Sequence, residues 1–144
     1  MSFEILPFAI DDCEEAMALW SRSEGIGLRG AADTRAGIAR YLERNPGGSF
    51  IARENGALVG AVLCGHDGRR GYLHHLAVAE SHRRHGIGAA LMNRCLAWLE
   101  AEGLERCHLF VHAGNEKADR FWTREGWSRR DDILMMSRDV ATPS

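Results

Sequence analysis

One turn of this chain combines the residue types that bind phosphate groups. Its sequence is Arg83-Arg84-His85-Gly86-Ile87-Gly88, of the form R-x-x-G-x-G. Glycines let a backbone approach a phosphate without an intervening Cβ atom, and arginines supply charge-assisted donors. An apolar run precedes the turn and an amphipathic helix follows it, so backbone N–H groups gather at the positive end of a helix. The pattern predicts a pyrophosphate site, and hence a phosphorylated cofactor.

Two common nucleotide-binding patterns do not fit this turn. The dinucleotide fingerprint G-x-G-x-x-G lacks its third glycine here, and the pattern G-x-x-x-x-G-K-[ST] is absent. Two alternatives stay open from the turn alone: an ordinary helix start with basic neighbours, and a binding domain for another phosphorylated ligand.

A second clue lies downstream of the turn. Asn115 is placed to cap a helix that carries Phe121 and Trp122. This helix and the helix of the basic turn each follow a strand, at 106–112 and 71–79, and strands joined by a helix pair in parallel. Ligands of α/β sheets bind at the carboxyl ends of strands. Both clues are therefore expected to meet in one cleft.

The rest of the sequence predicts the elements that hold these strands. Hydrophobic periodicity, helix caps (Asp33 or Thr34 for the second helix) and turn dipeptides such as Asn55-Gly56 give the order β-α-α-β-β-β-α-β-α-β. Strands are expected at 3–9, 49–54, 57–65, 71–79 and 106–112, with one or two more in 127–138, and helices at about 11–24, 34–45, 86–102 and 116–125. The fold class is α/β: a mixed, mostly antiparallel central sheet with a parallel pair in the middle and helices on both faces.

Composition is typical of a globular protein. The 144 residues are expected to form one domain, 1–144, with 45% hydrophobic and 26% charged residues. A formal net charge of −2 argues against a nucleic-acid-binding domain. Neither a signal peptide nor a membrane-spanning run is visible, and the four cysteines are widely spaced. We therefore expect a cytoplasmic protein with reduced thiols and no membrane attachment.

Two runs of residues give the sequence a family resemblance. Residues 76–91 read L-A-V-x-x-x-x-R-R-x-G-I-G-x-x-L, and residues 111–127 read V-H-A-G-N-E-K-A-x-x-F-W-x-x-x-G-W. Both resemble the GNAT superfamily of acyl-CoA-dependent N-acetyltransferases, in particular its small single-domain bacterial members. The resemblance implies the acyl-CoA N-acyltransferase fold and acetyl transfer from acetyl-CoA to a primary amine. The acceptor implied is a small-molecule amine or a protein or peptide amine, and small family members often form homodimers.

The resemblance also implies cofactor-binding roles. Backbone groups of Leu76, Ala77 and Val78 would bond the pantetheine arm of acetyl-CoA like an added strand. On the second helix, Asn115 would bond the pantetheine, and Phe121 and Trp122 would pack beside it. The pyrophosphate would be held by the turn and the helix start, that is, by Arg83, Arg84, His85, Gly86, Ile87, Gly88 and Ala89.

Acetyl transfer to an amine needs a group that accepts the amine proton, and histidine, with an ordinary pKa of about 6.5, suits this role. Strand alternation puts Tyr72, His74, Leu76 and Val78 on one face and His75 on the other. We expect His74 to act as the base, with His112 and Tyr72 as further candidates. The alternative is that His74 is simply hydrogen-bonded inside the sheet. His75 is expected to be structural.

Two residues depart from the family's pattern. Trp122 stands where many members have a tyrosine that protonates the departing thiolate. Phe110 stands where many ribosomal-protein acetyltransferases have a glutamate base. Water or a histidine would then protonate the thiolate, or the thiolate would leave readily without an acid. These departures keep an alternative function open, a CoA-sensing or regulatory module with little or no turnover.

No metal is expected in this protein. His82 and His85 are spaced as a pair of ligands, but no cysteine or carboxylate is placed to complete a site. The expected cofactor is acetyl-CoA alone, as a cosubstrate.

Overall fold

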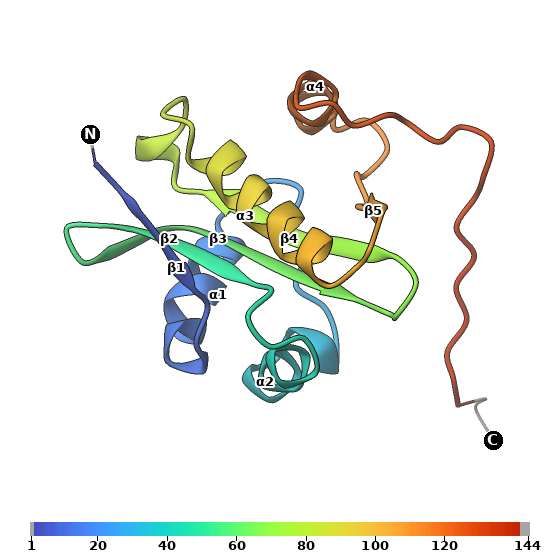
Figure 1. Ribbon diagram of the computed structural model, residues 1–144, viewed down its shortest axis with the longest axis horizontal. Coiled ribbons are helices and arrows are strands. Elements are labelled where there is room, and N and C mark those ends of the chain that lie inside the picture. The colour runs from blue at the N-terminus through green and yellow to red at the C-terminus, as the bar shows by residue number, and fades with distance from the viewer. Residues whose placement is uncertain (1, 142–144) are drawn as a thin grey trace. The chain divides into compact units, whose positions relative to one another are not determined.

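A five-stranded sheet forms the centre of the first of two compact units in the computed structural model, which describes residues 2–141. The first unit spans Met1–His112 and the second Ala113–Ser144. The strands are β1 (Glu4–Pro7), β2 (Phe50–Glu54), β3 (Ala57–His66), β4 (Gly71–Val78) and β5 (Cys107–His108), and they lie side by side in that order (Figure 1). All neighbours pair antiparallel except β4 and β5, which pair in parallel.

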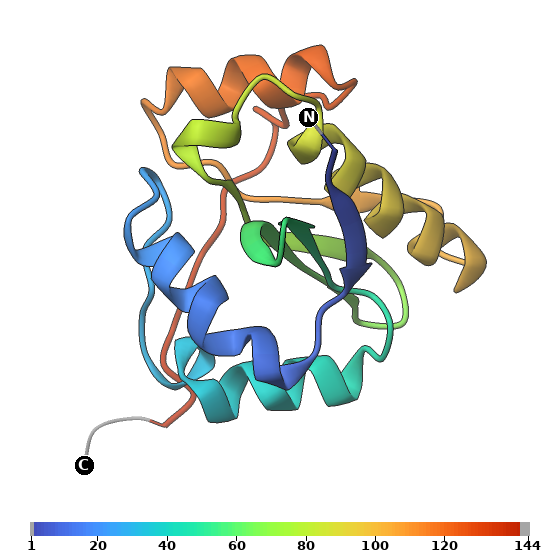
Figure 2. The ribbon, with the colours of Figure 1, turned by 90° about the vertical axis from the view of Figure 1, so that its left-hand side faces the viewer.

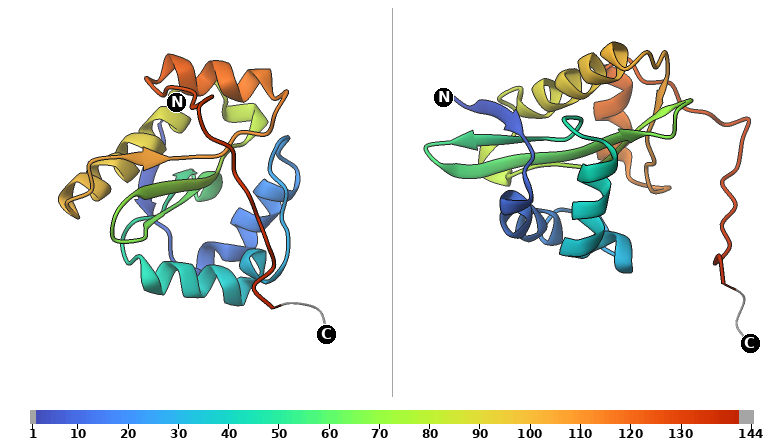
Figure 3. Two further views of the ribbon diagram at one scale, coloured as in Figure 1. Left: turned by 90° about the vertical axis from the view of Figure 1, so that its right-hand side faces the viewer. Right: turned by 60° about the horizontal axis from the view of Figure 1, so that its bottom comes forward.

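Helices cover both faces of this sheet. Helices α1 (Cys13–Ser21) and α2 (Arg35–Arg44) lie on one face, and α3 (Ile87–Ala101) lies on the other (Figures 2 and 3). Short 3-10 turns precede three of the longer elements: η1 (Ile10–Asp12), η2 (Ala31–Asp33) and η3 (Glu80–His82). The α/β fold class expected from the sequence is confirmed.

Local signals in the sequence set several element boundaries. Helix α2 begins after Thr34, one of its two predicted caps, whose hydroxyl accepts a hydrogen bond from the Gly37 N–H at 3.1 Å. The β2–β3 hairpin turns at Asn55 and Gly56, whose φ angles of 51° and 81° are the left-handed pair that a two-residue hairpin turn requires. These two boundaries could be predicted from single residues.

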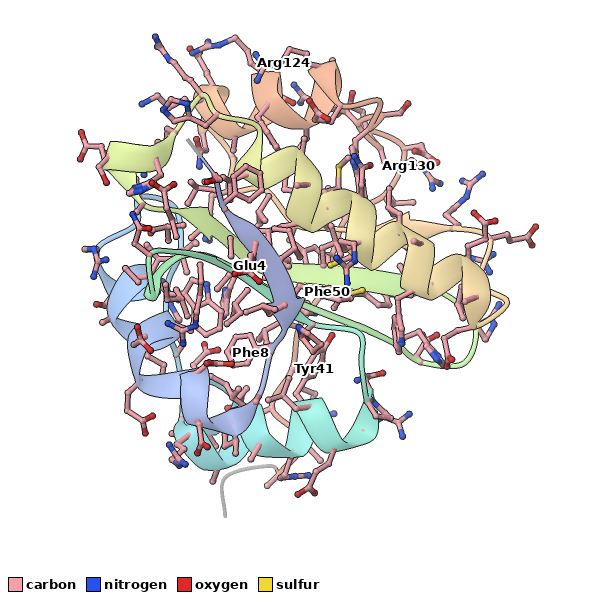
Figure 4. All side chains as sticks on the ribbon, turned by 60° about the vertical axis from the view of Figure 1, so that its left-hand side comes forward. Glu4, Phe8, Tyr41, Phe50, Arg124 and Arg130 are labelled. Atoms are coloured by element: carbon pink, nitrogen blue, oxygen red, sulfur yellow. The ribbon has the colours of Figure 1, made fainter. Side chains whose placement is uncertain are left out.

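Apolar side chains pack on both faces of the sheet. On the α1–α2 face, Trp20, Leu19 and Ile38 are fully buried in a cluster that includes residues of β3, and Phe8 stacks on Trp20 with a ring distance of 6.0 Å. Figure 4 labels Phe8 and Tyr41 on this side of the sheet. On the other face α3 lies very close to β4, because a Cβ atom at Gly71 would come within 2.6 Å of the Leu99 side chain. The sheet is therefore fixed between two apolar layers.

Three expectations about the sheet need correction. The strand expected at 106–112 is reduced to Cys107–His108, and residues 127–141 contain no strand in the described part of the chain. The parallel pair consequently lies at the edge of the sheet rather than in its middle. Alternating apolar residues do not make a strand unless a free edge pairs with them, and Ile133 to Met136 are exposed instead of buried.

The second unit contains α4 (Glu116–Arg124), which ends near its expected position. Asn115 caps this helix by accepting a hydrogen bond from the Ala118 N–H at 3.2 Å. Trp122 packs on Trp127, with ring centroids 5.3 Å apart. Among the described residues, no helix is both long enough and apolar enough to cross a membrane.

Candidate active site

The basic turn leads from η3 into α3 through two left-handed residues. Arg84 has φ of 68° and Gly86 has φ of 82°, and α3 starts directly afterwards at Ile87. A glycine adopts this conformation without strain, whereas the same conformation costs a residue such as Arg84 about 1 kcal/mol. The four residues from Arg83 to Gly86 are exposed. The turn therefore projects its backbone and its charges into solvent at the start of a long helix.

The start of α3 lacks the side-chain cap that α2 and α4 have. Thr34 caps α2 and Asn115 caps α4 through side-chain oxygens, but Gly86 offers α3 no side chain, and the first turn of α3 carries no acidic residue. The first N–H groups of a helix have no partner within the helix and lie at its positive end. An anion of two or more oxygens is the ligand that fits this arrangement.

Side-chain contacts hold the turn against the sheet. Arg83 Nε donates to the Val78 carbonyl oxygen at 3.2 Å, which ties the turn to the end of β4. His82 Nε2 lies 3.7 Å from Glu54 Oε2, which links η3 to the β2–β3 hairpin. Part of the Arg83 guanidinium is thus used within the protein, and its Nη groups are the ones that could reach a ligand.

The β4 edge next to the turn is open. Pairing with β5 is limited to Gly71 with Cys107 and Tyr72 with His108, and in the described residues no other strand pairs with this edge of β4. Backbone groups of an unpaired edge are free to accept an extended ligand as an added strand. The three residues predicted to bind pantetheine, Leu76, Ala77 and Val78, lie on this stretch.

A β-bulge in β4 overturns the predicted alternation. Leu63 pairs with His74 and Ala61 pairs with Ala77, so two residues of β4 stand opposite one residue of β3. His75, inside the bulge, has a φ of 56°. The bulge shifts the pattern by one residue. Val78, which pairs with Gly60 on the α3 side, therefore does not share the face of His74.

His74 lies on the α1–α2 side of β4, against α2. Its ring meets the Tyr41 ring edge-on, with centroids 5.9 Å apart. Burial lowers the pKa of His74 below its ordinary value, the nearby His75 adds to this effect, and Asp33 opposes it. Because no described residue forms a hydrogen bond with either ring nitrogen of His74, a neutral imidazole is available to accept a proton there.

His75 points to the α1–α2 layer and not, as the alternation predicted, to the opposite face. Its Nε2 lies 2.9 Å from Asp33 Oδ1, and its ring lies 5.1 Å from the Trp20 ring. Asp33 Oδ2 also accepts a hydrogen bond from the Arg29 N–H at 2.7 Å. The bulge is the reason that two consecutive histidines both turn toward the same helices.

The other predicted catalytic residues lie in different surroundings. The Tyr72 ring stacks beside the His74 ring at 6.3 Å, so these two candidates are brought together. His112 is exposed beyond the end of β5, and no described residue contacts it through a ring or a hydrogen bond. Tyr41 and Asp33 were not predicted from the sequence, because only the folded chain brings them to β4.

Asn115, Phe121 and Trp122 lie in the second unit. The side-chain oxygen Oδ1 of Asn115 accepts the hydrogen bond of the α4 cap. Its side-chain Nδ2 group is therefore the one that could donate to a ligand. Phe121 and Trp122 contact each other edge-on at 4.9 Å. Within residues 2–141, no cluster of three or more His, Cys, Asp or Glu side chains is arranged to hold a metal ion.

Known proteins resemble this chain in both sequence and fold. The sequence pattern of the Acetyltransferase (GNAT) family matches residues 14–127. An acetyltransferase of Pectobacterium atrosepticum is 37% identical over 135 residues, which cover 94% of each chain. A GCN5-related N-acetyltransferase from Ralstonia eutropha is 26% identical and superimposes with a TM-score of 0.69 over 98% of this chain and 100% of the other.

A further solved structure, the PaiA N-acetyltransferase of Thermoplasma acidophilum in complex with coenzyme A, gives a TM-score of 0.79 at 18% identity. It covers 91% of this chain and 92% of its own, and it supports the fold. Because the family pattern covers most of the sequence and the Pectobacterium relative matches it at 37% identity, this chain belongs to the GNAT family of acetyltransferases, the acetyl-CoA-dependent acyltransferases that its sequence resembles.

Proposed function

We propose that this chain transfers the acetyl group of acetyl-CoA directly to a primary amine, with both substrates bound at once. The observation that carries the proposal is the uncapped start of α3 beside the open edge of β4. An anion site and an extended backbone edge, next to each other, suit a ligand with a pyrophosphate at one end and an amide-containing arm.

The residues present fit acetyl-CoA at each part of this ligand. N–H groups from Gly86 to Ala89 would face the pyrophosphate, with Arg84 adding charge. Backbone groups of β4 from Leu76 onward would bond the pantetheine arm. When bound, acetyl-CoA supplies the acetyl thioester. In the second unit, Asn115 Nδ2 is proposed to donate to the same arm.

His74 is proposed to take the proton that the acceptor amine must lose. An amine attacks only as the neutral base, so a nearby acceptor in its neutral form is required. Burial favours the neutral form of His74 at pH 7. Fixing the amine beside the thioester contributes independently, because orientation alone is worth about 7–11 kcal/mol in favourable cases.

We propose that residues 1–144 act as one domain. The family match from 14 to 127 runs across the boundary between the two units, which supports this proposal.

Trp122 favours one alternative, a CoA-binding module with little turnover. Indole has no acidic proton, so it cannot replace a tyrosine that protonates a thiolate. Thiol release from acetyl-CoA in the presence of a panel of amines separates the two functions. Amine-dependent release supports the transferase, whereas tight CoA binding without release with any amine supports the binding module.

A further inference from the structure

We infer that the acceptor is an amine joined by a short carbon chain to an aromatic ring, and that it binds on a cluster of four rings around His74. This inference rests on the proposed function and names its substrate class. The cluster, here called the ring cluster, consists of Tyr41, Tyr72, His74 and Phe110.

The ring cluster is built around three rings that stand nearly parallel. Tyr72 and His74 are 6.3 Å apart with an interplanar angle of 9°, and Tyr72 and Phe110 are 6.2 Å apart at 16°. His74 and Phe110 are 6.3 Å apart at 25°. Tyr41 closes one side edge-on, at 79° to His74. Flat faces of this kind attract aromatic rings and also cationic groups.

Exposure increases across the ring cluster. Tyr41, Tyr72 and His74 are partly buried, whereas Phe110 is 59% exposed. An exposed phenylalanine beside a partly buried histidine offers an apolar surface next to the proposed base. An acceptor ring that covers Phe110 would place an attached amine close to His74.

Charge near the ring cluster argues against acceptors with several ammonium groups. Asp33 is the carboxylate whose charge acts on His74. This carboxylate is already used by His75 and by the Arg29 N–H. The other charged or titratable group acting on His74 is His75, which is not negative. A second ammonium of a polyamine or an aminoglycoside would therefore have to compete with His75 and the Arg29 N–H for the Asp33 carboxylate.

The test compares acceptors in a thiol-release assay with saturating acetyl-CoA. The amines are phenylethylamine, hexylamine, spermidine and kanamycin. We expect kcat/KM for phenylethylamine to exceed that for hexylamine by about tenfold, because ring stacking adds to apolar burial. Spermidine and kanamycin are expected to be poorer than hexylamine.

Variants at Phe110 show whether the ring is responsible. Phe110→Leu keeps an apolar side chain and removes the ring, so the preference for phenylethylamine over hexylamine should fall to about twofold or less, through KM. Phe110→Trp keeps a ring face and should retain the preference. Leu134→Ala, which truncates an exposed apolar residue of the second unit, is the control and should change neither value.

The outcomes test the aromatic acceptor separately from the transferase function. Equal kcat/KM for phenylethylamine and hexylamine, or a preference for spermidine or kanamycin, overturns the aromatic acceptor and leaves the transferase function intact. A preference that survives Phe110→Leu overturns the ring cluster as its cause. Absence of thiol release with all four amines overturns the acceptor class. The proposed function is contradicted only when the wider panel of amines, peptide amines included, also gives no release.

Discussion

Asp33 Oδ1 and His75 Nε2 lie 2.9 Å apart, and this contact joins η2 to the bulge of β4. Both side chains are largely buried, with exposed fractions of 14% and 19%. The carboxylate accepts from the ring nitrogen, and its other oxygen accepts from the Arg29 N–H. One aspartate thereby fixes both the loop before α2 and the residue that follows His74.

Replacing Asp33 should loosen the bulge. Asp33→Ala removes both hydrogen bonds, so we expect the free energy of unfolding to fall by about 2 kcal/mol. A lower kcat with an unchanged KM for acetyl-CoA should accompany this loss, because the displaced residue is next to His74. Asp33→Asn keeps an accepting oxygen and should recover most of both quantities. Urea unfolding measures the free energy, and steady-state kinetics measure kcat and KM. Asp11→Ala, at an exposed aspartate, is the control. If Asp33→Ala and Asp11→Ala have equal effects, Asp33 does not hold the bulge in place.

Gly86 should be required for coenzyme binding. Gly86→Val forces a branched side chain into φ of 82° and alters the N–H groups at the start of α3, so CoA affinity measured by calorimetry should fall at least about tenfold. Gly68 is a matched control, because it is also left-handed and has equally open space at its Cβ position. Gly68→Val should reduce stability only. Unchanged CoA affinity in Gly86→Val would remove the pyrophosphate from this turn.

Arg84 should show opposite effects on stability and binding. Arg84→Gly relieves the left-handed strain, so the free energy of unfolding should rise by up to about 1 kcal/mol. The same change removes a cation from the turn, so CoA should bind several-fold more weakly and with less dependence on salt. Thermal unfolding and calorimetry at two salt concentrations test this. If Arg84→Gly binds CoA as tightly as the wild type, the Arg84 side chain does not contribute to coenzyme binding.

His74 should determine the acid side of the pH–rate profile. Since burial lowers its pKa, the inflection in kcat/KM should lie below about pH 6.5, and activity should be lost as pH falls through it. His74→Ala should remove this inflection and reduce kcat about a hundredfold or more. His112→Ala is the informative comparison. If the inflection disappears in that variant and persists in His74→Ala, His112 is the base.

The same histidine gives stability a predictable pH dependence. A folded-state pKa below the unfolded value means that the unfolded chain binds the proton more readily. Stability from this group is therefore complete above about pH 6.5 and declines as the pH falls through the folded pKa. Chemical unfolding at pH 7.5 and pH 5.0 should show a smaller decline for His74→Gln than for the wild type. An identical decline would mean that His74 is not held neutral by the fold.

The sequence predicted those parts of the fold that depend on neighbouring residues. Thr34 as a cap and Asn55-Gly56 as a hairpin turn are examples, because their preferred conformations are local. The bulge at His75 was not predictable, since it depends on how β4 pairs with β3. Alternation in the sequence assigned His75 to the wrong face for this reason.

In the candidate site too, local features could be predicted from the sequence and tertiary contacts could not. The basic turn and the start of α3 follow from glycines and arginines close together in sequence, and both are where they were expected. Tyr41 reaches His74 from a helix about thirty positions earlier, and only tertiary packing brings them together. The role of α4 residues stays a prediction.

The bulge at His75 limits where related chains can gain or lose residues. Losing one residue at His75 would restore regular alternation and exchange the facing of every side chain on one half of the strand. Insertions and deletions are therefore disfavoured here, while the loop before α2 can change length at little entropic expense. Evolution of new acceptor preferences should proceed through that loop and spare the strand.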